Sequence, residues 1–253
     1  MQLICCLSGK KRSGKNTAAN YIAGRYLQYM RAITQFRIEK NGWLSIKVNN
    51  HWISVYEGEF NRLFADKSIK LYSFADPLKE FCIDVFGLAH EQCYGTEEQK
   101  NSLTSLLWKD MPEVDDYLNG VDDIEYKTKI KSRMAAREIL QYFGTNVVRK
   151  MYGNAWVNAT IAKIRRDNKR LAIITDARFP NEIEGVQQNG GLTIRLLRNV
   201  AGKDEHSSET ALDNYPHESY SYIVDNKKHT IEEQNRLLDP IVDAMFRKLR
   251  HED

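Results

Sequence analysis

The first seventeen residues restrict the fold of this chain more than any other segment. An apolar run over residues 3–7 is followed by GKKRSGK at residues 9–15, which has the form G-x-x-x-x-G-K. After this motif, apolar residues recur at helical spacing from Ala19 to Met30. Because the motif lies where a strand ends and a helix begins, it predicts a strand–loop–helix unit whose loop binds phosphate groups. The alternative is a glycine-rich turn of a βα unit that serves the fold alone.

The chemistry of this loop comes from its backbone and from one lysine. Glycines let backbone N–H groups point into one small concavity, the helix N-terminus adds positive potential, and Lys15 adds a full charge. The residues predicted to bind the nucleotide lie in the loop and in the first helical turn: Gly9, Lys11, Arg12, Ser13, Gly14, Lys15, Asn16 and Thr17.

The position after the lysine narrows the class of protein. Most P-loop NTPases have Ser or Thr there to bind Mg²⁺, but this chain has Asn16, followed by Thr17. This argues against a GTPase or a motor ATPase, and the G-K-x-T order is similar to that of nucleoside monophosphate kinases. Asn16 can offer the metal only a neutral amide oxygen, so we expect Mg²⁺ to be held largely by the nucleotide and by water.

The rest of the sequence predicts an α/β fold of the P-loop NTPase type, with a doubly wound, mainly parallel, five-stranded sheet. The expected strands are 2–7, 69–74, 171–175, 192–197 and 221–225, and the expected helices include 14–30, 77–86, 134–143 and 231–250. The helix over 134–143 is expected to end at Gly144, with Thr145 or Asn146 capping the next helix.

We expect a single domain over residues 1–253 that carries two insertions. Residues 42–60 alternate between apolar and polar on both sides of Asn49-Asn50, which is typical of a small β-hairpin. Residues 94–132 are polar with few strand signals, which indicates a mostly helical insertion on the substrate side.

Composition excludes several classes of function. The chain has 253 residues, 42% of them hydrophobic and 28% charged, and no apolar stretch approaches membrane-spanning length. A net charge of +3 is too small to indicate nucleic-acid binding by itself. The cysteines and histidines show no metal-ligand spacing, and no leader pattern precedes the loop. We therefore expect a cytoplasmic protein that acts on small molecules, with no membrane, no nucleic-acid partner and no metal site of its own.

Charged residues follow the expected strands, at the sheet edge where α/β proteins bind their ligands. Asp176 ends a buried strand, Arg178 follows it, and Glu182 opens the next helix. The functional interpretation gives Asp176 a metal-water or substrate contact and Arg178 a phosphate contact. The alternative is a loop-capping aspartate and a surface ion pair. Lys79, in the first turn of another expected helix, either binds an acceptor phosphate or is solvated.

Six segments together indicate a protein family: LSGKKRSGKNT, FADPLK, REILQYFGTN, NAWVN, ITDARFPNE and HSSET…YIVDN. In order and spacing they closely resemble the deoxynucleoside monophosphate kinases of tailed bacteriophages over most of the chain, apart from 42–60 and parts of 94–132. The resemblance implies ATP-dependent phosphorylation of deoxynucleoside monophosphates to diphosphates. It also implies a monophosphate site lined by Lys79, Arg137, Gly144, Thr145, Trp156, Asp176, Arg178 and Glu182.

From the motifs and the resemblance together, we predict a kinase that uses ATP and Mg²⁺. Its predicted catalytic residues are Lys15, Arg12, Arg137, Arg178 and Asp176. Trp156 either offers an aromatic face to the base or belongs to the core. The polar loop at 199–210, which contains His206, and the 94–132 insertion are expected to close over the substrates, although an ordinary exposed loop has the same composition.

Two other hypotheses stay open at this point. One is a different small-molecule P-loop kinase, such as a dephospho-coenzyme A kinase. The other is a non-catalytic nucleotide-binding or DNA-packaging accessory protein. A second cationic site at Lys79, Arg137 and Arg178 favours a kinase, because a pure binder needs none. A homodimer is compatible with the sequence, and the host cytoplasm is the expected location if the chain is phage-encoded.

Overall fold

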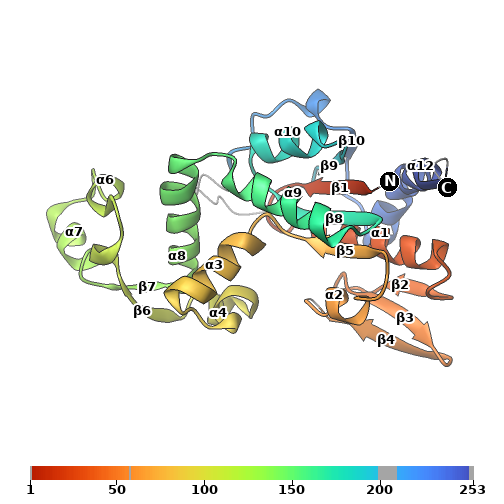
Figure 1. Cartoon of the computed structure of the whole chain (residues 1–253), viewed down its shortest axis with the longest axis horizontal. Helices are drawn as coiled ribbons and strands as arrows, with labels where there is room; N and C mark the ends of the chain where they lie inside the picture. The colour runs from red at the N-terminus through yellow and green to blue at the C-terminus, as the bar shows by residue number, and fades with distance from the viewer. Residues whose placement is uncertain (1, 57, 199–209, 251–253) are drawn as a thin grey trace. The chain divides into compact units, whose positions relative to one another are not determined.

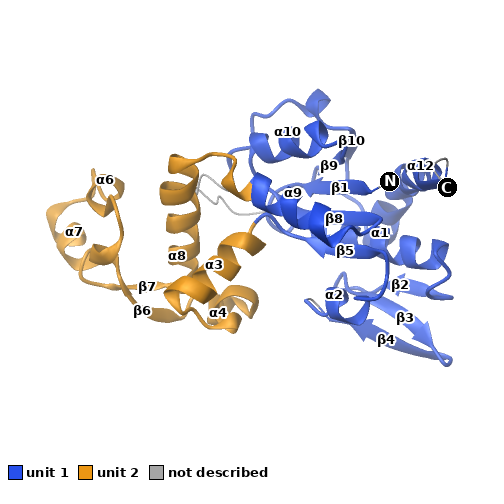
Figure 2. Ribbon diagram, in the orientation of Figure 1, with its two compact units in different colours: residues 1–74, 157–253 blue, residues 75–156 orange. Residues whose placement is uncertain are grey.

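The computed structural model of the chain describes residues 2–56, 58–198 and 210–250. The chain divides into two compact units (Figure 2). The first draws on residues 1–74 and 157–253, and the second on residues 75–156. The first unit therefore contains the glycine-rich loop, and the second contains the polar segment 94–132.

A five-stranded sheet forms the centre of the first unit, and its paired strands are all parallel (Figure 1). The strand order is β10-β9-β1-β8-β5. The strands are β1 (Leu3–Ser8), β5 (Ile69–Tyr72), β8 (Leu171–Ala177), β9 (Leu192–Leu196) and β10 (Tyr222–Val224). This confirms the predicted α/β class and the parallel sheet. Since the strands are parallel, their carboxyl ends meet at one edge.

Helices cover both faces of this sheet. They are α1 (Lys15–Tyr29), α9 (Ala155–Asp167), α10 (Pro180–Gln188) and α12 (Ile231–Arg250). Leu3 and Leu7 of β1 belong to the core shared with α1 and α12, whereas Ile4 and Cys6 belong to the core shared with α9 and α10. This alternation follows from the two-residue period of a strand. In the described ranges, no helix has the length and apolar character needed to cross a membrane.

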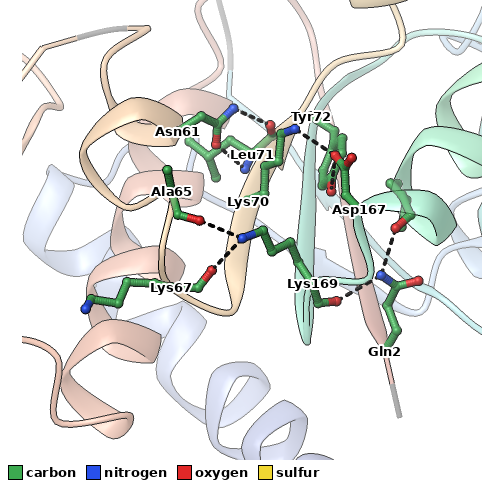
Figure 3. Close-up of polar contacts among 10 residues, drawn as sticks. Gln2, Asn61, Ala65, Lys67, Lys70, Leu71, Tyr72, Asp167 and Lys169 are labelled. Carbon is green, nitrogen blue, oxygen red and sulfur yellow. Dashed lines mark hydrogen bonds and ion pairs between the residues drawn. The ribbon is translucent and has the colours of Figure 1, made fainter.

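The outer edge of β5 is closed by polar side chains (Figure 3). Asn61, on α2 (Phe60–Leu63), donates from Nδ2 to the Leu71 carbonyl at 2.7 Å and accepts from the Leu71 N–H at 2.8 Å. On the side of β5 that faces β8, Lys70 pairs with Asp167, the last residue of α9, at 2.6 Å. An amide that imitates a neighbouring strand leaves fewer backbone groups open to pairing with another chain.

A separate three-stranded antiparallel sheet lies in the first unit, in the order β2-β3-β4. Its strands are β2 (Phe36–Ile38), β3 (Leu44–Val48) and β4 (His51–Val55). Asn49 and Asn50 form the turn with φ of 47° and 65°, which confirms the predicted hairpin; strand β2 was not predicted. Phe36 lies so close to Gly24 of α1 that a Cβ there would come within 2.5 Å of its ring. The small sheet therefore packs on the helix that follows the loop.

The second unit contains short helices and one two-stranded antiparallel sheet. The elements are α3 (Asp76–Phe86), α4 (His90–Tyr94), α5 (Glu97–Lys100), β6 (Leu103–Leu107), η1 (Trp108–Asp110), α6 (Val114–Tyr117), α7 (Asp123–Lys129), β7 (Arg133–Ala135), α8 (Ala136–Gln141) and η2 (Tyr142–Arg149). The expected helices in 94–132 are present, but strand β6 was not predicted. Its partner β7 lies outside that segment, so no local pattern reveals the pairing.

The prediction that a helix ends at Gly144 is wrong. Helix α8 continues directly into η2, a π-helical stretch that runs through Gly144 and Thr145 to Arg149. Thr145 and Asn146 are therefore inside a helix and do not cap the start of one. The glycine is needed for packing, because a Cβ at this position would come within 2.5 Å of Leu78 Cδ2.

Candidate nucleotide site

The loop between β1 and α1 depends on both of its glycines. A Cβ on Gly9 would come within 2.3 Å of Ser13 Oγ and 3.0 Å of the Leu196 carbonyl oxygen. Gly14 has a φ of 93°, and a Cβ there would lie 2.7 Å from Gln234 Oε1. Between the glycines, Arg12 also has a positive φ, 62°. The loop thus closes tightly on itself at positions that side chains of other residues would block.

Lys15 is the first residue of α1, and its side chain folds back along the loop. Its Nζ donates to the carbonyl oxygens of Gly9 at 2.6 Å and Lys10 at 2.8 Å. Burial lowers the pKa of Lys15 to about 8; Arg178 and Arg195 add to this shift, and Asp176 opposes it. The ammonium group therefore lies within electrostatic range of charged groups from two other strands.

The other predicted loop residues differ in their surroundings. Lys11 and Arg12 are exposed, and so is Asn16 in the first turn of α1. Thr17 lies against the segment before β3, because a Cβ on Gly42 would come within 2.3 Å of Thr17 Oγ1. The structure thus brings Gly9 to Lys15 into one loop, while the Thr17 hydroxyl lies beside Gly42.

A buried polar layer supports the loop from behind, and the sequence did not reveal it. Asn226, which follows β10, donates from Nδ2 to the Ser13 carbonyl at 2.9 Å and to Gln234 Oε1 at 2.6 Å. The side chains of Asn226 and Gln234 are almost fully buried. The only signal in the sequence was YIVDN, a segment of the resemblance that had no assigned role.

Asp176 lies near the end of β8, at the carboxyl edge of the sheet, as predicted. Its carboxylate accepts a hydrogen bond from Ser73 Oγ at 2.5 Å and one from the Phe74 N–H at 2.7 Å. Since Ser73 and Phe74 directly follow β5, Asp176 ties the carboxyl ends of two neighbouring strands together. Its charge also reaches Lys15, so the carboxylate has a structural and an electrostatic effect at this edge.

Glu182 supports Arg178 through the backbone. Its buried carboxylate accepts hydrogen bonds from the N–H groups of Arg178 at 2.7 Å and Phe179 at 3.1 Å. This caps the N-terminus of α10, where negative charge is favourable. The Arg178 charge in turn lowers the pKa of Lys15. Arg178 therefore lies near the loop lysine, and Glu182 holds the backbone of Arg178 in place.

Arg195 is a further charged residue at this edge that sequence reasoning did not include. It is 7% exposed and lies on β9, where its register partner is Ser8 of β1. Its Nη1 donates to Ser8 Oγ at 3.0 Å. A charged residue inside the apolar run LTIRLL was the signal that marked it in the sequence.

The second unit holds the other predicted acceptor residues. Lys79 of α3 lies over the ring of Tyr94, 4.4 Å from its centroid. Arg137 of α8 pairs with Glu97 at 2.9 Å. Both cations are thus held by side chains of the short helices α4 and α5.

Trp156 and Gly144 lie together in this unit. The indole Nε1 donates to the Gly144 carbonyl at 3.0 Å, and Trp156 is 8% exposed within the core of the unit. Thr145 follows Gly144 in η2 and is partly exposed. The structure therefore places Trp156 in the core, which was the alternative to a base-stacking role.

Two of the predictions concern metal ligands and the loop at 199–210. Over the described ranges, no three His, Cys, Asp or Glu side chains are grouped so that they could hold a metal ion. The part of the predicted 199–210 loop at 199–209, with His206, lies outside the described residues.

Comparison with known proteins shows the family of this chain. An α/β protein of the P-loop NTPase type is the class that the parallel sheet defines. The profile of the deoxynucleotide monophosphate kinase family matches residues 3–236. A protein of Acanthamoeba polyphaga mimivirus named "Putative deoxynucleotide monophosphate kinase" is 31% identical over 177 residues, covering 64% of this chain and 76% of that protein. The chain belongs to the deoxynucleotide monophosphate kinase family, and thus to the phosphotransferases.

Proposed function

We propose that this chain transfers the γ-phosphoryl group of ATP to the phosphate of a deoxynucleoside monophosphate. The observation that carries the proposal is the proximity of three charged groups from two separate segments: Lys15 of the loop lies within electrostatic range of Asp176 and Arg178, which belong to the carboxyl end of β8. Phosphoryl transfer depends mainly on positioning and on neutralising phosphate charge. A cation beyond the loop lysine suits a site where two phosphate-bearing molecules meet.

The loop would bind the donor. Backbone N–H groups between Gly9 and Gly14, with Lys15 and Arg12, would hold the β- and γ-phosphates. Mg²⁺, when bound with ATP, would neutralise part of the phosphate charge. The residues present fit a Mg²⁺ ion that takes most of its ligands from the nucleotide and from water. Asn16 is exposed beside the loop and could supply one further ligand, its amide oxygen.

The cations outside the loop would bind the acceptor. In the first unit, Arg178 would supply charge for the acceptor phosphate, and Arg guanidinium groups suit bidentate phosphate contacts. That Lys79 and Arg137 of the second unit bind the same phosphate is what the family resemblance implies, and it stays a prediction. An acceptor oxygen then attacks the γ-phosphorus, the bond from that phosphorus to the β,γ-bridging oxygen breaks, and ADP leaves with the electron pair. Because the acceptor phosphate is already ionised, the reaction needs no general base.

The direct test is an ADP-release assay with each deoxynucleoside and ribonucleoside monophosphate as acceptor, and with dephospho-coenzyme A. We expect ADP release that depends on at least one deoxynucleoside monophosphate, with the matching diphosphate as product. Lys15→Ala is the matched control, and should be inactive while still folded. Turnover with dephospho-coenzyme A alone would support the other kinase hypothesis. No turnover with any acceptor, despite ATP binding, would support a non-catalytic nucleotide binder.

A further inference from the structure

Arg195 is a buried cation that the transfer described so far does not use. Its guanidinium donates from Nη1 to Ser8 Oγ, while Nε is buried and has no hydrogen-bond partner among the described residues. Taking a charged group out of water costs several kcal/mol unless an anion and further hydrogen bonds compensate it. A cation at the start of a phosphate-binding loop therefore calls for a counter-charge.

The described part of the chain supplies no such counter-charge. Arg195 forms an ion pair with none of the described carboxylates. The oxygens of Asp176 and Glu182 accept hydrogen bonds from other groups. The ring of Tyr220 lies 5.8 Å from the guanidinium carbon, but burial raises the pKa of this phenol, so it stays neutral. Burial likewise raises the pKa of the Cys6 thiol on the same sheet face. Among the described residues the charge of Arg195 is therefore uncompensated, and an anionic ligand at the loop would supply the counter-charge.

The position of Arg195 indicates which ligand group this is. Lys15 holds its ammonium at the Gly9 and Lys10 carbonyls, at the beginning of the loop. Arg195 reaches the residue just before the loop, Ser8, and its charge is felt by Lys15. In loops of this form the lysine reaches the β- and γ-phosphates. Both cations thus lie at the beginning of the loop that would hold these phosphates.

We propose that Arg195 is a further catalytic residue, whose guanidinium contacts the γ-phosphoryl group and neutralises its charge during transfer. This rests on the proposed function. Arg195 acts as a fixed hydrogen-bond donor and charge and exchanges no proton. In oxyanion holes, loss of one preorganised donor lowers kcat by about 100- to 1,000-fold, and we expect a loss of similar size here.

The test compares three variants by kcat, by KM for each substrate and by thermal unfolding. Arg195→Gln removes the charge, Arg195→Lys keeps it, and Ser8→Ala removes only the protein partner of Nη1. We expect Arg195→Gln to lose at least about 100-fold in kcat, Arg195→Lys to recover part of that loss, and Ser8→Ala to lose less than about fivefold. If Arg195 merely supported the loop through Ser8, Ser8→Ala would match Arg195→Gln, and the proposal would be overturned.

Two further outcomes need their own measurements: misfolding of Arg195→Gln, and failure of the proposed function. If Arg195→Gln does not fold, Arg195→Lys carries the test, and wild-type kcat in that variant would count against a forked guanidinium contact. If the wild-type protein phosphorylates no acceptor, the proposed function fails, and calorimetric binding of inorganic tripolyphosphate then tests Arg195 alone. We expect at least about tenfold weaker binding to the folded variant that lacks the guanidinium; equal affinity would overturn the proposal.

Discussion

Replacing Asn226 by Leu should weaken both the fold and the loop. The side chain is completely buried, and its Nδ2 donates to the Ser13 carbonyl and to Gln234 Oε1. Leu is close in size but leaves these two acceptors without their donor. Each buried polar group that loses its partner costs about 1–3 kcal/mol. Part of this is offset, because Asn226 Oδ1 has no partner among the described residues and its removal relieves a buried polar atom.

The net loss in the free energy of unfolding should be about 2 kcal/mol, which corresponds to a drop in Tm of about 4–8 °C for a protein of this size. Urea unfolding without nucleotide measures the first quantity and calorimetry the second. Because Ser13 belongs to the loop, the KM for ATP should also rise. Asp225→Ala is the matched control: Asp225 is exposed, lies 3.6 Å from the Lys227 ammonium and accepts a hydrogen bond from the Lys227 N–H at 3.2 Å, and should contribute about 1 kcal/mol or less.

A double-mutant cycle with Gln234→Leu sharpens the argument. Since Asn226 and Gln234 share a hydrogen bond, the double variant should lose less stability than the sum of the single losses, by about 0.5–3 kcal/mol. Strict additivity, together with an unchanged KM for ATP in Asn226→Leu, would refute the view that this buried layer positions the loop.

Three other perturbations have defined outcomes. The kcat/KM for ATP should fall as pH rises above about 8, because Lys15 of the free enzyme loses its charge there. The kcat should be less affected, since bound phosphate favours the charged amine. A flat pH profile of kcat/KM up to pH 9.5, about one and a half units higher, would contradict this. Arg137→Ala and Arg178→Ala should raise the KM for the monophosphate or lower kcat, with ATP affinity by calorimetry nearly unchanged; the reverse pattern would mean that the two sites are assigned the wrong way round. Gly144→Ala should lower the free energy of unfolding by about 1–3 kcal/mol through overlap with Leu78, and an unchanged urea midpoint would show that Leu78 moves aside freely.

The central sheet and its loop could be predicted because their signals are local. Strands such as β1 and β8 are continuous apolar runs, and the loop motif lies directly after β1. The hairpin was visible from Asn49-Asn50, whose side chains tolerate a positive φ. Gly144 misled the prediction, because a glycine that ends a helix and one that allows close packing look the same in a sequence.

The missing parts of the site depend on contacts between distant residues. Arg195 and Ser8 are 187 positions apart, and Asn226 and Ser13 are 213 apart. Only the strand order brings them together. Glu182 was correctly placed at the start of a helix, but its bonds to the Arg178 and Phe179 N–H groups follow from burial at that helix end. A sequence pattern identifies such residue types without showing which partners they meet.

The most direct test of the account follows the γ-phosphate itself. The protein is incubated with ATP labelled at the γ-phosphate and with a deoxynucleoside monophosphate, and the products are separated by chromatography. The account predicts that the label appears in the deoxynucleoside diphosphate, and that Lys15→Ala abolishes this transfer while the protein stays folded. Label that appears only as inorganic phosphate, or transfer that survives in Lys15→Ala to within about tenfold of wild type, would contradict it.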